Sequence, residues 1–279
     1  MVQKYIENLA ERTKTTIAVA EDDYHDKDGF LVCGKCHTRK EIEVSLPWGK
    51  IRPYCLCECE KAKQDKEREV QEEKQRRERI QRFRDNAFPD GSLADCTFDR
   101  ASDPNNKLIL AMQRYVDNFR QFKDDGRGIL LYGSVGTGKT FLAACTANAL
   151  IDKGMPVLMT SVSYIANKLM GMFEGKNEYI ESLNTYPLLV LDDLGAERNT
   201  EYMNEVVYTI INARYKAKLP LVVTTNLTTE QLKAPTDVTM ARTYSRVLEM
   251  CFPIKVEGVD IRREKARSEY KTMSDILGL

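Results

Sequence analysis

The chain has 279 residues, enough for one large domain with a smaller appendage and for a sizeable hydrophobic core. Its 42 Lys and Arg residues balance 42 Asp and Glu residues, so the overall charge does not mark a nucleic-acid-binding protein, and any contact with a polyanion must come from a local patch. Residues 1–25 lack the long apolar core of a signal peptide, and no other run approaches the roughly 18 apolar residues of a membrane span, so we expect a cytoplasmic protein.

After a predicted helix over residues 2–13, the first informative feature is a cluster of cysteines. Five of the eight cysteines lie between residues 33 and 59, which favours a metal site in a reducing compartment over a disulfide scaffold. Two of them form a C-x-x-C knuckle like that of a zinc ribbon, and the others follow in a C-x-C-x-C run. We expect a structural Zn²⁺ on Cys33, Cys36, Cys55 and Cys59, with Cys57 as the alternative to Cys59.

The same module, about residues 30–59, is expected to contain a two-stranded ribbon. Segment 41–46 alternates polar with apolar residues, and segment 51–54 can return as its partner strand. So small a unit buries little apolar surface, so a metal clamp would help it to fold. The alternative is a reduced thiol segment that holds no metal.

Residues 60–85 form a highly charged run without Gly or Pro. Ten Lys or Arg residues are interspersed with eight Asp or Glu residues, which predicts an exposed helix supported by salt bridges. Its second half is net basic, which would suit contact with phosphate groups. The alternative is that the helix is a solvated spacer between two folded regions. Pro89 and Gly91 would end the helix, and the predicted regions are residues 1–59, a linker helix 60–87 and a domain 88–279.

The third region begins with a predicted helical segment between residues 98 and 125. Its apolar residues fall close to one side of a helix: Leu108, Leu110, Met112, Tyr115, Val116, Phe119 and Phe122. We expect this side to pack against the core of the domain that follows.

The glycine-rich stretch 133–140 fits the phosphate-binding pattern G-x-x-x-x-G-K-[ST] at every fixed position. The apolar run 128–132 before it predicts a strand, and the Ala- and Leu-rich run 141–150 after it predicts a helix. Glycines let the backbone aim its N–H groups at a polyanion, and the helix N-terminus adds a favourable dipole. The predicted nucleotide-binding residues are Gly133, Ser134, Val135, Gly136, Thr137, Gly138, Lys139 and Thr140, with Lys139 on the β- and γ-phosphates of ATP and the Thr140 hydroxyl on Mg²⁺.

Two carboxylates and an amide complete the predicted site. The apolar run 187–191 predicts a buried strand that ends in Asp192 and Asp193. In an NTPase site, the first carboxylate holds Mg²⁺ through water and the second polarises the attacking water. Asn226 ends the predicted strand 221–226, where its amide can orient that water; a turn or helix-cap role is the alternative.

Strands and helices alternate from residue 128 onward, which predicts a parallel sheet with helices on both faces and a ligand at the carboxyl ends of the strands. The further predicted strands are 156–160 and 252–256, and the further predicted helices are 162–173, 176–184, 201–218, 236–251 and a short terminal helix opened by Arg262 and Arg263. A GTPase is disfavoured because the chain has no Asn-Lys-x-Asp motif to read guanine. A small-molecule kinase stays open, since an acceptor pocket has no short signature.

Taken together, these motifs resemble those of the AAA+ ATPases. Runs 136–143 and 191–197 are most similar to the DnaC/DnaI helicase loaders and to their relative, the IstB-like ATP-binding proteins, and the resemblance covers about residues 88–279. It implies that Arg246 is an arginine finger for a neighbouring subunit's site, with Arg242 as the second choice, and that Arg262 or Arg263 is the sensor-2 arginine on the γ-phosphate. An arginine supplied in trans acts only after assembly, so hydrolysis would report assembly.

The resemblance also implies a function. It suggests an ATPase, Mg²⁺-dependent and slow, whose ATP-bound subunits associate and load a replicative helicase onto single-stranded DNA, with the N-terminal region gripping the helicase. Asp193 stands where many relatives carry Glu, and the shorter side chain suits slow turnover. Tyr164, Lys168 and Phe173 are candidates for contact with the single strand. The alternatives are an IstB-like ATPase that targets transposition on duplex DNA and a non-catalytic interaction module.

Overall fold

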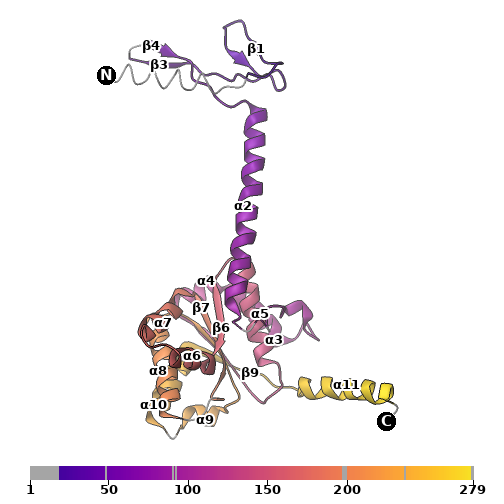
Figure 1. Ribbon diagram of the computed structural model, residues 1–279, viewed down its shortest axis with the longest axis vertical. Helices are drawn as coiled ribbons and strands as arrows, with labels where there is room; N and C mark the ends of the chain where they lie inside the picture. The colour runs from indigo at the N-terminus through magenta and orange to yellow at the C-terminus, as the bar shows by residue number, and fades with distance from the viewer. Residues whose placement is uncertain are drawn as a thin grey trace. The chain divides into compact units, whose positions relative to one another are not determined.

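The computed structural model describes residues 19–47, 49–89, 91, 93–196, 200–235 and 237–277. The chain divides into two compact units, Met1–Arg77 and Glu78–Leu279, and each has its own internal packing (Figure 1). The predicted helix over residues 2–13 lies outside the described residues.

The first unit contains two small antiparallel ladders. β1 (Tyr24–His25) pairs with β2 (Leu31–Val32), and β3 (Val44–Leu46) pairs with β4 (Gly49–Ile51). The β3–β4 ladder is the predicted ribbon, but it is shorter than expected. On the N-terminal side of β3, the Ile42 N–H donates to the Pro53 carbonyl at 3.1 Å. Pro53 has no N–H with which to extend the ladder.

A buried lysine joins the parts of this unit. Lys40 is only 3% exposed, and its Nζ lies 2.7 Å from Asp23 Oδ2 and 3.2 Å from Glu60 Oε1. Hydrogen bonding to Asp23, opposed by burial, raises the pKa of Lys40 well above its usual value. Because a buried charge is costly unless it is paired, this arrangement fixes the segment before β1 against the first turn of the following helix.

Helix α2 (Glu58–Ala87) has 30 residues and is exposed along most of its length, as the charged run predicts. Its last turns differ, because Ile80, Phe83 and Ala87 pack into a core of the second unit. The boundary between the compact units therefore lies inside this helix, after Arg77. The apolar side chains near the end of the helix are stabilised by burial against this core, whereas the charged side chains of its middle part stay in solvent.

The second unit is built on a five-stranded parallel sheet with the strand order β6-β7-β8-β5-β9. The strands are β5 (Gly128–Tyr132), β6 (Val157–Ser161), β7 (Leu188–Leu194), β8 (Leu221–Thr225) and β9 (Cys251–Lys255). Ile129 and Leu131 of β5 belong to one core and Leu130 to another, since successive side chains of a strand point to opposite faces. Both faces of the sheet are thus buried at β5 to β8, as the sequence predicts, whereas the edge strand β9 is largely exposed.

Helices cover the two faces (Figure 1). One core includes α3 (Lys107–Asp117) and α5 (Lys139–Asp152), and the other includes α6 (Val162–Met170), α8 (Glu201–Lys216) and α10 (Val238–Met250). α7 (Lys176–Ser182) and α9 (Thr229–Lys233) are shorter, and α11 (Ile261–Leu277) is longer than the short terminal helix that the sequence predicts. None of the helices in the described part of the chain combines the length and apolar composition that crossing a bilayer requires.

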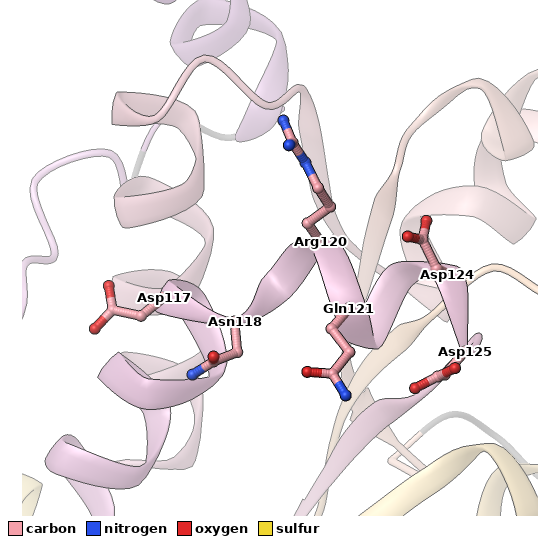
Figure 2. Close-up of a pocket in the computed structure, with 6 residues that line it drawn as sticks. All are labelled: Asp117, Asn118, Arg120, Gln121, Asp124 and Asp125. Carbon is pink, nitrogen blue, oxygen red and sulfur yellow. The ribbon is translucent and has the colours of Figure 1, made fainter.

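The segment 98–125 is broken into three pieces, not one helix. A 3₁₀ turn (Phe98–Arg100) precedes α3, and α4 (Phe119–Asp124) follows it after a break at Asn118. The Asn118 side chain donates to the Arg114 carbonyl at 2.8 Å, and side-chain bonds of this kind compete with the helical pattern. The break leaves a shallow hollow of about 560 Å³, shown in Figure 2 and lined by Asp117, Asn118, Arg120, Gln121, Asp124 and Asp125.

One fully buried arginine ties together the chain segments that enter β7 and β8. The Arg214 guanidinium on α8 donates to the carbonyls of Leu183 (3.3 Å), Tyr186 (2.8 Å), Pro187 (3.3 Å) and Pro220 (2.6 Å). Burial lowers the pKa of Arg214 to about 10. Since β7 and β8 carry the predicted carboxylates and Asn226 at their ends, Arg214 helps to set the scaffold of the candidate site.

Candidate functional site

The glycine-rich stretch joins β5 to α5, in the strand-to-helix context that the motif requires. Gly136 and Gly138 have φ values of 82° and 94°, which side chains rarely tolerate. A Cβ at Gly136 would also collide with the Asp260 carboxylate, and one at Gly133 with the Val256 carbonyl. The loop is therefore a turn that only glycine can form here, and α5 begins at Lys139 directly after it.

Lys139 lies folded over this loop. Its side chain is buried, and Nζ donates to the Gly133 carbonyl at 3.0 Å and to the Ser134 carbonyl at 2.7 Å. Burial lowers the pKa of Lys139, although the nearby carboxylates oppose this effect. An ammonium group in this place is able to turn from the loop carbonyls to an anion bound in the same loop.

Asp192 and Thr140 face each other across the site. The Thr140 hydroxyl donates to Asp192, with Oγ1 2.9 Å from Oδ1 and 3.2 Å from Oδ2. Burial raises the pKa of Asp192, against the hydrogen bonds from Thr224 and Thr140. A hydroxyl and a carboxylate oxygen in contact are donors of the type that Mg²⁺ prefers.

Thr224 on β8 is a site residue that the sequence analysis missed. Its hydroxyl donates to Asp192 Oδ1 at 2.6 Å and accepts from the Asp193 N–H at 2.8 Å. The signal available in sequence is a hydroxyl residue two positions before Asn226, at the end of an apolar strand. Thr224 joins both carboxylate residues of β7 to the neighbouring strand.

Asp193 occupies an unusual backbone conformation. Its φ is 59°, and β7 has a bulge there, since Leu191 pairs with Val223 but Leu194 pairs with Thr225. A bulge redirects side chains, and strained residues cluster at functional sites. Asn226 Nδ2 donates to Asp193 Oδ1 at 3.1 Å, so the predicted amide and the predicted second carboxylate do lie together.

The residues gathered here fit a magnesium-bound triphosphate. The glycine turn bends the backbone tightly before α5, and the head of α5 supplies backbone N–H groups. Thr140 and Asp192 supply oxygen ligands on one side, and Lys139 supplies a cation on the other. Asp193 follows Asp192 on β7 and accepts the bond from Asn226.

The arginines implied by the resemblance lie in two places. Arg246 on α10 is half-buried and stacks on two aromatic rings of α8, whereas Arg242 is exposed. Arg262 is in the first turn of α11, which begins against the phosphate loop because the Ile261 N–H donates to the Gly136 carbonyl at 3.0 Å. The charge of Arg262 also lowers the pKa of Lys139. Arg263 instead forms an ion pair of 3.2 Å with Asp260.

Four cysteines of the first unit form a compact group. The Sγ atoms of Cys33, Cys36, Cys57 and Cys59 all lie within 4.8 Å of one another. Four thiolates around a tetrahedral Zn²⁺, with Zn–S bonds of about 2.3 Å, require separations of about 3.8 Å, so the group fits a structural zinc site.

The expected member Cys55 is not in this group, and the structure corrects that expectation in favour of Cys57. The Cys55 N–H is held by the Lys40 carbonyl at 2.7 Å, and its Sγ points to the Arg39 carbonyl at 3.5 Å. Cys57 and Cys59, by contrast, flank the start of α2 at Glu58, and the first helical turn brings their thiols together.

Comparison with known proteins places this site in a family. The model of the IstB-like ATP binding protein family matches residues 63–269, which is well over half of the chain. The chain belongs to this family. The match includes the whole nucleotide site and begins after the cysteine group, which therefore lies outside the IstB-like region.

The chain is similar to two proteins named as replicative helicase loaders. The chain is 30% identical to DnaI of Bacillus subtilis (strain 168) over 187 residues, covering 61% of this chain and 59% of that protein. It is 29% identical to DnaC of Escherichia coli (strain K12) over 133 residues, covering 46% of this chain and 52% of that protein. The chain thus spans somewhat over half the length of these relatives.

Solved structures agree with these sequence matches. A crystal structure of DnaI has a TM-score of 0.51 and 27% identity, covering 61% of this chain and 92% of that one. A crystal structure of the DnaC helicase loader has a TM-score of 0.50 and 26% identity, covering 59% of this chain and 98% of that one. The predicted AAA+ type of P-loop fold and the resemblance to the DnaC/DnaI group are confirmed.

Proposed function

We propose that this protein is an ATP-driven loader of a replicative DNA helicase. One observation carries the proposal: the complete phosphate-loop site, with Asp192 bonded to Thr140, lies in a region similar to two proteins named as helicase loaders. ATP binding and hydrolysis would act as the switch between holding and releasing the helicase. Since the chain spans only part of those relatives, the activity of the whole protein is part of the proposal.

The residues of the site have distinct roles in this scheme. Bound Mg²⁺-ATP supplies the phosphoryl group that is transferred to water. Lys139 would turn from the loop carbonyls to the phosphates and neutralise their charge. Thr140 and Asp192 would hold the Mg²⁺ ion. Asp193 polarises the attacking water and Asn226 orients it, since the two side chains are already bonded to each other.

Arg246 would act on the nucleotide of a neighbouring copy, and Arg262 on the γ-phosphate in its own site. A finger supplied in trans makes hydrolysis depend on assembly. This property suits a loader, which must not hydrolyse ATP before it has assembled on its target. Asp193 is one methylene shorter than Glu, and we expect turnover to be slow.

The second unit is the proposed binding site for single-stranded DNA. Phe173, after α6, is fully exposed, and Tyr164 and Met170 of α6 are exposed as well. Lys168 on the same helix places its Nζ 4.5 Å from the Tyr179 ring centroid. Exposed aromatic rings beside a lysine suit base stacking and phosphate contact, which supports the assignment of Tyr164, Lys168 and Phe173 to the strand.

The first unit is the proposed grip on the helicase. It lies outside the IstB-like match and has its own packing, with a cysteine group that suits a structural Zn²⁺. Zinc held by all four thiolates would have no open position, so its role is to fix the fold of the unit rather than to take part in chemistry.

A loading assay tests the proposal. The full-length protein is mixed with a hexameric replicative helicase and a single-stranded DNA circle carrying an annealed oligonucleotide, and displacement of the oligonucleotide is measured with and without ATP. We expect displacement that needs ATP and is lost in Lys139→Ala, with Lys153→Ala, a lysine in the turn after α5, as the matched control. ATP-dependent binding to duplex DNA without any effect on the helicase would instead identify a transposition-targeting ATPase.

A further inference from the structure

Arg246 sits between two tyrosine rings of a neighbouring helix. Its guanidinium carbon lies 4.9 Å from the Tyr208 ring centroid and 5.5 Å from the Tyr215 ring centroid. The two tyrosines are seven residues apart on α8, so they occupy the same side of that helix about two turns apart. All three side chains are half-buried, which leaves part of this stack open to solvent.

The contacts of Arg246 differ from those of the other packed arginine of this unit. Arg214 directs its donors to four backbone carbonyls and is completely buried. Arg246 lies against two ring faces, its hydrogen bond with the Tyr208 side chain lowers the pKa of Tyr208, and its Nη1 is buried without a hydrogen-bond partner among the described residues. A ring face restrains a planar guanidinium but does not saturate its N–H groups. Arg246 is therefore restrained, and its buried Nη1 keeps an unused donor.

The Tyr215 side of the stack is itself anchored. The Tyr215 hydroxyl donates to Glu249 Oε1 at 3.0 Å, and Arg127 Nη1 donates to the Glu249 carbonyl at 2.6 Å. Glu249 lies one turn after Arg246 on α10, so the ring that packs on the guanidinium is fixed to the helix that carries it. Arg242, one turn before Arg246, is exposed and has no such stack in the described structure.

We propose that Tyr208 and Tyr215 are positioning residues that hold Arg246 ready for the nucleotide of a neighbouring copy. This inference rests on the proposed function, in which Arg246 acts in trans. Long side chains lose rotamer freedom when they engage a ligand, and a guanidinium already held between two rings has less freedom to lose. The stack also explains why Arg246, rather than the exposed Arg242, would be the finger.

Mixed oligomers of the full-length protein separate this role from damage to the protein's own ATP site. The acceptor is Arg246→Ala, which binds ATP but lacks the finger. The donor is Lys139→Ala, which has a defective ATP site but an intact finger, so hydrolysis in the mixture comes from acceptor sites completed by donors. The test donor carries Lys139→Ala together with Tyr208→Leu, and a second test donor carries Lys139→Ala with Tyr215→Leu.

We expect the Lys139→Ala donor to restore hydrolysis to the acceptor, and each Leu-bearing donor to restore about tenfold less kcat with an unchanged KM for ATP. Donors with Tyr208→Phe or Tyr215→Phe keep the ring and lose only the hydroxyl contacts with Arg246 and Glu249, so they should restore more hydrolysis than the Leu-bearing donors. Melting curves and the amount of mixed oligomer are measured for every donor, so that a loss of folding or assembly is recognised. Tyr208 and Tyr215 provide two independent variants of the same stack.

The outcomes distinguish the positioning role of the two tyrosines from the trans role of Arg246. If the Leu-bearing donors rescue as well as the simple donor, the tyrosines do not position the finger, and the proposed trans role of Arg246 is untouched. If the Lys139→Ala donor enters mixed oligomers and still gives no rescue, Arg246 does not act in trans, and the positioning inference is overturned with it.

Discussion

Thr224 offers the sharpest test of how the candidate site is held together. Replacing it by Val keeps the shape of the side chain and removes the hydroxyl. That hydroxyl donates to Asp192 Oδ1 at 2.6 Å and accepts from the Asp193 N–H at 2.8 Å, and the residue is completely buried. Thr224→Val therefore loses one bond to a carboxylate and one to a backbone N–H.

The next residue supplies a matched control. Thr225 is equally buried, and its hydroxyl donates to the Leu194 carbonyl at 2.6 Å and accepts from the Leu227 N–H at 3.1 Å. A neutral hydrogen bond contributes about 0.5–1.5 kcal/mol and a bond to a charged group about 1.5–3 kcal/mol. Thr224→Val should then reduce the free energy of unfolding of the second unit by about 2–4 kcal/mol, and Thr225→Val by about 1–3 kcal/mol.

The decisive difference is in activity rather than stability. Both variants are measured by urea denaturation and by steady-state ATP hydrolysis at saturating ATP. Thr224→Val should lower kcat on the order of tenfold, because Asp192 and Asp193 lose their common anchor, while Thr225→Val should stay near wild type. Loss of the Thr224 bond also raises the pKa of Asp192 further in the free protein, so the acid limb of the kcat/KM profile should move to higher pH. Equal activities and pH profiles in the two variants would refute the reasoning.

Three further outcomes are expected. Asp192→Asn should raise the melting temperature of the nucleotide-free protein, because it removes a carboxylate whose pKa is raised by burial, and should abolish the thermal shift given by Mg²⁺-ATP; a retained shift would contradict the assigned role. Arg214→Leu should destabilise the second unit by at least about 4 kcal/mol in urea denaturation, since four buried or part-buried carbonyls lose their donor, and a loss below about 1 kcal/mol would count against the clamp. Purified protein should hold one Zn²⁺ per chain by colorimetric chelator titration, lost in Cys57→Ser and kept in Cys55→Ser; the reverse pattern would restore Cys55 as a ligand.

Much of the second unit's fold follows from the sequence because its signals are local. Short apolar runs at 128–132 and 221–225 became buried parallel strands, and the glycine turn fixed where one of them becomes a helix. The break at Asn118 was not predictable from apolar spacing, because α3 and α4 keep their apolar residues in the same core on both sides of it.

The features that the sequence did not reveal depend on register and on where an element begins. Cys55 and Cys57 have equivalent spacing in the sequence, and the start of α2 at Glu58 decides which thiol joins the group. Thr224 resembles an ordinary strand residue, and it becomes a site residue only because β8 is aligned with the bulge of β7. Both distinctions depend on three-dimensional register, so the hydroxyl two positions before Asn226 marks Thr224 only as a candidate.

The bulge also allows the chemistry of Asp193 to be separated from its conformation. A non-glycine residue at a φ of 59° carries strain of order 1–3 kcal/mol, less for Asp and Asn, whose short polar side chains tolerate this region. Asp193→Asn keeps that tolerance and keeps an oxygen for the bond from Asn226, but it lacks the carboxylate. We expect Asp193→Asn to fold within about 0.5 kcal/mol of wild type and to bind ATP with unchanged affinity, while hydrolysis falls by at least about 100-fold. Asp193→Ala should lose hydrolysis and about 1 kcal/mol of stability as well. Urea denaturation, fluorescent-nucleotide titration and single-turnover hydrolysis measure the three quantities, and an Asn variant that hydrolyses ATP at the wild-type rate would show that another group polarises the water.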